Sequence, residues 1–115
     1  MLKKAMVCGA IVCLMAGYGY GSAKGADFAK GKTLFTSRCV LCHGAEGKGN
    51  GPAAMTLSPK PADFTSKTFW QTPDIDRTMT DFIKNGKGPM PAFPDLSAGD
   101  IQDVVQYIEH AFKPK

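Results

Sequence analysis

The stretch Cys39-Val40-Leu41-Cys42-His43 carries the strongest signal in this 115-residue chain. Two thiols three positions apart lie on one side of a helical turn, where both can add across the vinyl groups of a single porphyrin. The imidazole that follows is carried under the ring and can bind the iron. Cys-x-x-Cys-His is therefore the attachment pattern of c-type haem. The sequence predicts one covalent haem c, tethered through Cys39 and Cys42, with His43 as an axial iron ligand.

Two other interpretations of the cysteine pair are weaker. A redox dithiol expects a strand before the pair and a thioredoxin-like alternation of strands and helices. A zinc site needs two further ligands, normally a second Cys or His pair. Apart from Cys8 and Cys13 near the start of the chain, no further cysteine is present, and only His110 remains as a second histidine.

The N-terminus has the anatomy of a secretory signal peptide. Lys3 and Lys4 form a short basic start, an apolar run covers residues 5–16, and Gly21-Ser22-Ala23 offers small residues for cleavage after position 23. The apolar run is shorter than the roughly 20 residues that a spanning helix needs. We expect a signal peptide over 1–23 and export to the periplasm, an uncleaved N-terminal anchor being the alternative.

Cleavage would leave a single domain over 24–115 in which the motif cysteines are the only ones. Of 14 basic residues, two would be lost with the signal peptide, leaving 12 against 10 acidic ones and a net charge of +2. Haem propionates bring that charge near neutral, so nothing indicates a nucleic-acid partner. A small exported domain without disulfides needs another source of stability, which covalent haem can provide.

The remaining sequence predicts an all-α fold of short helices and irregular loops. A first helix starts after Asp27, and the motif follows it within a turn. Residues 44–70, rich in glycine and proline, are predicted to be a loop draped over the cofactor. Thr72-Pro73-Asp74 predicts the start of a second helix, which ends at Asn85-Gly86. A near capping box at Ser97–Asp100 opens a last helix with an apolar stripe that ends at Phe112.

The second axial position has several candidates, because methionine or histidine commonly fills it in electron carriers. Met90 stands in Gly88-Pro89-Met90-Pro91, where the prolines stiffen the loop that would hold its thioether at the metal. Met79 falls on the apolar face of a predicted helix, and core packing is the better interpretation for it and for Met55. His110, near the C-terminus, fits a solvated side chain. We predict Met90 as the sixth ligand.

Taken together, these residues resemble the small monohaem class I c-type cytochromes of bacteria. The resemblance runs from Asp27 to Phe112 and rests on the haem motif near the N-terminus, Gly49–Pro52, and the segment Gly88–Phe93 before the last helix. It implies that Gly31 lets the first and last helices cross closely, with Phe35 and Tyr107 packing at the crossing. It also implies that the carbonyl of Pro52 accepts a hydrogen bond from His43.

The resemblance and the residues together predict a single-haem electron carrier and no enzyme. With both axial positions filled, the iron has no place for a substrate. Its partners would be donor and acceptor redox proteins, met through an exposed haem edge that Lys48, Lys84 and Lys87 flank. We expect a monomer without stable membrane insertion. The alternatives are a sensor, ligand-binding or peroxidase-like haem protein with a weak or open sixth position, and a dedicated subunit of a membrane oxidoreductase.

Overall fold

The computed structural model describes residues 25–115, so the predicted signal peptide and its cleavage site lie outside the described residues. Within this part the fold is all-α, as predicted, and no strand is present apart from one isolated bridge between Lys87 and Met90. The elements are α1 (Phe28–Arg38), α2 (Val40–His43), η1 (Ala54–Thr56), α3 (Lys67–Trp70), α4 (Ile75–Asn85) and α5 (Ala98–Phe112). No helix of this part is long and apolar enough to cross a membrane.

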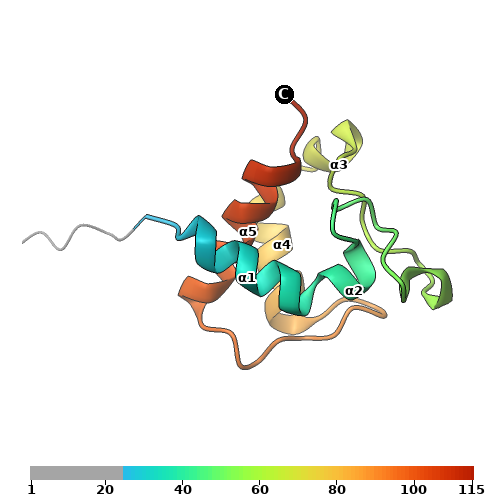
Figure 1. The fold of residues 1–115 in the computed structure, drawn as a ribbon, viewed down its shortest axis with the longest axis horizontal. Coiled ribbons are helices and arrows are strands. Elements are labelled where there is room, and N and C mark those ends of the chain that lie inside the picture. The colour runs from blue at the N-terminus through green and yellow to red at the C-terminus, as the bar shows by residue number, and fades with distance from the viewer. Residues whose placement is uncertain (1–24) are drawn as a thin grey trace, which may run out of the picture.

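The first and last helices cross in close contact, as Figure 1 shows for α1 in cyan and α5 in red. A Cβ atom at Gly31 would lie 2.2 Å from the backbone oxygen of Asp103 and 2.8 Å from the Cβ atom of Tyr107, so only glycine fits at this contact. The ring of Phe35 packs beside Tyr107, with centroids 5.6 Å apart. The close crossing predicted at Gly31 is therefore confirmed.

Local sequence signals start the longer helices. The Asp27 side chain accepts a hydrogen bond from the Lys30 amide at the start of α1, and Ser97 and Asp100 form a reciprocal capping box at the start of α5. Helix α4 begins later than Thr72-Pro73 indicated: Asp74 has a φ of +52°, a left-handed conformation that helical residues do not adopt, and the helix starts at Ile75.

The core lies between α1, α4 and α5. Its buried side chains come mainly from these helices, joined by Phe64 from the loop before α3; they are Phe35, Phe64, Met79, Ile83, Ile101, Val104, Val105 and Ile108. The segment between α4 and α5, orange in Figure 1, runs beneath α2 and closes the molecule on that side. Beside the core lies a cavity that α2, the long loop and this segment line together.

Candidate haem site

The motif residues lie where α1 gives way to α2. Cys39 separates the two helices, and its amide donates to the carbonyl of Phe35, 2.9 Å away. The amide of His43 in turn donates to the Cys39 carbonyl at 2.9 Å, which closes the helical turn. Gly44, with a φ of +78°, ends α2 directly after the histidine. Both cysteines and the histidine are half-buried at a bend of the chain.

These residues line a cavity of about 420 Å³. This volume lies within the range of about 300–1,000 Å³ that is common for cofactor sites. The potential cofactor-binding side chains on its wall are Cys39, Cys42, His43, Met79 and Met90. The rest of the wall is mainly apolar and includes Phe69, Phe82, Ile83 and Ile108. Two thiols, an imidazole and two thioethers around one apolar space fit a covalently tethered haem.

The His43 ring is held by two contacts. Its Nδ1 atom lies 3.3 Å from the carbonyl oxygen of Ala62, and its face stacks on the ring of Phe64, with centroids 4.6 Å apart and planes 18° from parallel. Burial lowers the pKa of His43 below its ordinary value, and the Ala62 carbonyl opposes this only in part. The imidazole is therefore neutral near pH 7, the form that binds a metal, and donation through Nδ1 leaves the lone pair on Nε2.

The prediction that Pro52 accepts this hydrogen bond is wrong, because the carbonyl next to the ring belongs to Ala62. After α2 the chain turns back along the helix: the amides of Gly49 and Gly51 donate to the carbonyls of His43 and Cys42, 2.8 and 3.0 Å away. Pro52 then follows on the exposed outer side. A carbonyl acceptor has no side-chain signature, so the sequence held no sign that residue 62 would take this place.

Met90 reaches the cavity from a short turn. The amides and carbonyls of Lys87 and Met90 pair reciprocally at 2.9 and 3.0 Å, and Gly88 between them has a φ of +54°. Met90 is half-buried and lies on the same cavity wall as the buried Met79.

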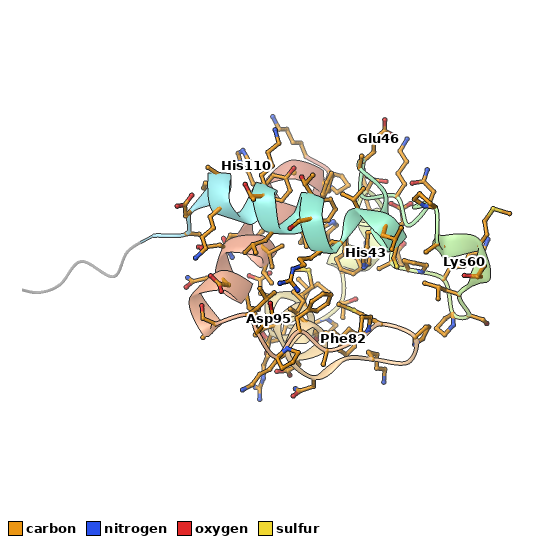
Figure 2. All side chains as sticks on the ribbon, turned by 60° about the horizontal axis from the view of Figure 1, so that its bottom comes forward. His43, Glu46, Lys60, Phe82, Asp95 and His110 are labelled. Carbon is orange, nitrogen blue, oxygen red and sulfur yellow. The ribbon has the colours of Figure 1, made fainter. Side chains whose placement is uncertain are left out.

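The other candidates for the second axial position lie away from the cavity. The expectation that Met55 fills the core is wrong: its side chain is 91% exposed, because η1 buries Ala54 and turns Met55 to the solvent. His110 is also exposed and packs on Phe28, with ring centroids 4.9 Å apart, as a solvated histidine would. Figure 2 shows His110 on the far side of the molecule from Lys60, with His43 near the middle.

Three cationic side chains border the cavity, and no acidic one does among the described residues: Arg38, Lys60 and Lys87. Arg38 also pairs with Asp95, 57 residues further along the chain. Of the lysines expected around the haem edge, only Lys87 borders the cavity, whereas Lys48 pairs with Glu46 at 3.3 Å. A positive rim suits the negatively charged propionates of a haem.

The alternative uses of the cysteines find little support in this geometry. Burial raises the pKa of the Cys39 thiol to about 11, whereas reactive dithiols rely on a lowered pKa. Over residues 25–115 no three His, Cys, Asp or Glu side chains gather into a group that could hold a metal ion. Neither a redox dithiol nor a zinc site is indicated.

Comparison with known proteins places this arrangement among haem proteins. Residues 26–108 match the family described as cytochrome c oxidase, cbb3-type, subunit III. A cytochrome c6 from Rippkaea orientalis is 38% identical over 87 residues, which cover 75% of this chain and 72% of the relative. A cytochrome c6 from Leptolyngbya boryana is 36% identical over 84 residues, covering 72% of this chain and 91% of the relative. Among solved structures, the c-type cytochrome SorU from Sinorhizobium meliloti shares the fold, with a TM-score of 0.52 and 23% identity over 76% of this chain and 95% of SorU.

Proposed function

Because this chain belongs to the family of the cbb3-type cytochrome c oxidase subunit III and is a small monohaem class I c-type cytochrome, we propose that His43 and Met90 are the axial ligands of its iron. The cofactor is one covalent haem c, and the protein transfers electrons. The proposal assigns Cys39 and Cys42 to the two thioether links. It rests above all on one observation, that the four side chains line the same cavity.

Each residue has a defined task in this proposal. When bound, haem c supplies an iron that gains or loses a single electron. His43 would hold the iron through Nε2, while donation from its Nδ1 to the Ala62 carbonyl keeps the tautomer and the ring position fixed. Met90 offers a neutral thioether, which favours the reduced iron and raises the potential relative to a second histidine. Apolar side chains such as Phe69 and Ile108 exclude water from the site.

The protein accepts one electron from a donor protein and passes it to an acceptor, and it catalyses no reaction of its own. Two side-chain ligands leave the iron no free position for a substrate. Contact with partners is proposed at the cavity mouth, where Leu41 and Phe82 are 64% and 36% exposed and Lys60 and Lys87 are exposed beside them. We propose that the mature protein works in the periplasm as a monomer.

The ligand assignment is tested with purified holoprotein variants in which one methionine is replaced. Met90→Ala is expected to lose the ferric absorption band that arises from methionine-to-iron charge transfer, to bind carbon monoxide when reduced, and to have a lower midpoint potential. Met79→Leu and Met55→Leu are the matched controls, because Met79 lines the same cavity and Met55 is exposed. Both controls should keep the band and the potential.

Unchanged spectra for Met90→Ala would refute the assignment of Met90 as a ligand. Loss of the band in Met79→Leu alone would instead identify Met79 as the sixth ligand. If the wild-type protein lacks the band and binds carbon monoxide rapidly, the sixth position is open. The protein then belongs with sensor or peroxidase-like haem proteins rather than with electron carriers.

A further inference from the structure

Phe64 occupies an unusual place for a core residue, since it is the one aromatic side chain of the described part that stacks on the His43 imidazole. Its own main chain is fixed at both ends. The Phe64 amide donates to the carbonyl of Gly47 at 2.7 Å, and its carbonyl accepts a hydrogen bond from Trp70 Nε1, also at 2.7 Å. Phe64 is 5% exposed. This ring therefore has little freedom to follow a movement of its neighbour.

Two further aromatic contacts of Phe64 add to this constraint. Phe69 meets its ring edge-on, with centroids 5.2 Å apart, and Phe112 lies nearly parallel at 6.2 Å. Phe112 in turn packs against Gly47, where a Cβ atom would lie 2.8 Å from the ring. The plane of Phe64 is thus set by the Gly47 carbonyl, by α3 and by α5, independently of the histidine.

The imidazole needs two constraints to hold one orientation. The Nδ1 hydrogen bond to Ala62 fixes a point on the ring but still allows the plane to tilt about the line between the two atoms. A flat ring against one face removes that tilt. Ala62 and Phe64 are two residues apart, so a single short segment delivers both constraints to His43.

We propose that Phe64 is a positioning residue that fixes the plane of the His43 imidazole and thereby tunes the reduction potential of the iron. The inference rests on the proposed function, in which His43 is an axial ligand. The orientation of an imidazole plane decides which iron d orbitals its π electrons meet, so a change in that plane alters the electronic structure of the ferric iron. Contacts around a ligating histidine act on the metal in this way.

The test compares Phe64→Met with Phe69→Met in the purified holoprotein. Both variants replace a ring on the cavity wall by a flexible side chain of similar volume, but Phe69 has no stacking contact with His43. The readouts are the g values of the ferric low-spin signal in electron paramagnetic resonance, the midpoint potential, and thermal unfolding. Phe64→Met should broaden and shift the g values and change the potential, while Phe69→Met should lower the unfolding temperature with g values close to wild type.

Phe64→Tyr keeps a flat ring at the position and should restore the wild-type g values. If Phe64→Met loses stability as Phe69→Met does and leaves the g values and the potential unchanged, Phe64 is only a core residue and the inference is overturned. Should Phe64→Tyr not fold, the comparison of the two methionine variants alone decides. A wild-type protein without a histidine–methionine spectrum would instead refute the proposed ligands, which separates the two failures.

Discussion

The cavity wall that carries His43 (residues 39–64, the His43 wall) is tied together by main-chain hydrogen bonds, whereas the wall that carries Met90 (residues 79–93, the Met90 wall) depends on one turn and on the helix behind it. In the His43 wall, successive loop amides donate to the carbonyls of α2, and the last of them, Ala53, reaches Leu41 at 2.9 Å. In the Met90 wall, the turn at Lys87–Met90 is joined to α4 by the Phe93 amide, which donates to the carbonyl of Ile83 at 2.9 Å.

This difference indicates how each ligand is placed. The His43 side chain follows a backbone that a series of main-chain hydrogen bonds holds in place. Met90 is the partly buried residue of an otherwise exposed turn, which depends for its stability on the packing of α4 against α5. Substitutions that weaken one wall should therefore spare the ligand of the other, which three predictions examine.

The largest effect is expected for Met79→Ala, which removes the buried support of the Met90 wall. Met79 is 6% exposed and belongs to the core cluster between α4 and α5. Truncation of a buried methionine to alanine costs about 2–5 kcal/mol, and we expect about 4 kcal/mol here, measured as the free energy of unfolding of the holoprotein in urea. The charge-transfer band should persist below the transition. Loss of the band together with a small stability change would mean that Met79, not Met90, binds the iron.

A glycine in each wall offers the next comparison. A Cβ atom at Gly51 would lie 2.3 Å from the carbonyl oxygen of Leu41 and 2.5 Å from that of Val40, whereas at Gly88 no atom lies within 4 Å. Gly51→Ala must push the loop away from α2 and should cost about 3 kcal/mol. Gly88→Ala meets only the strain of a φ of +54° and should cost about 1 kcal/mol.

Urea unfolding of the two holoproteins measures this pair, and resonance Raman or paramagnetic resonance reports on the ligands. Gly51→Ala should disturb the signal of His43 while the methionine band persists. Equal stability losses in the two variants would show that the two walls do not differ in rigidity.

How far the sequence could predict this comparison depends on the range of the interactions. The helices were predictable because caps such as Ser97 and apolar periodicity act over a few residues, and Gly31 matched a family pattern. The short α3 was missed, since four residues in a proline-rich stretch give no periodic signal. The acceptor for His43 was predicted at Pro52, 10 positions before the true acceptor Ala62, because the loop returns to the ring only after passing along the outside of α2. The exposed Met55 and the ring of Phe64 depend on the same loop path, which local patterns do not encode.

The smallest effect is expected away from both walls, at Asp100 in the capping box of α5. Lys30 Nζ lies 2.5 Å from its carboxylate, and this pairing, together with the Ser97 amide, lowers the pKa of Asp100 to about 2. The folded-state pKa is thus below the value of about 3.9 in an unfolded chain. The carboxylate therefore contributes its full stability above about pH 4 and loses it as the pH falls through about 2. Asp100→Asn removes this contribution, so the free energy of unfolding should fall less steeply between these pH values than in the wild type.

Urea midpoints at several pH values measure the slope. The control is Asp81→Asn, an exposed site on α4 without an ion pair among the described residues. The capping box lies outside both walls, so in Asp100→Asn the methionine band and the g values near pH 7 should stay unchanged. Helix α5 supports both walls from behind. A shift of the band or of the g values would therefore show that the cap transmits strain to one wall and that the walls are not independent.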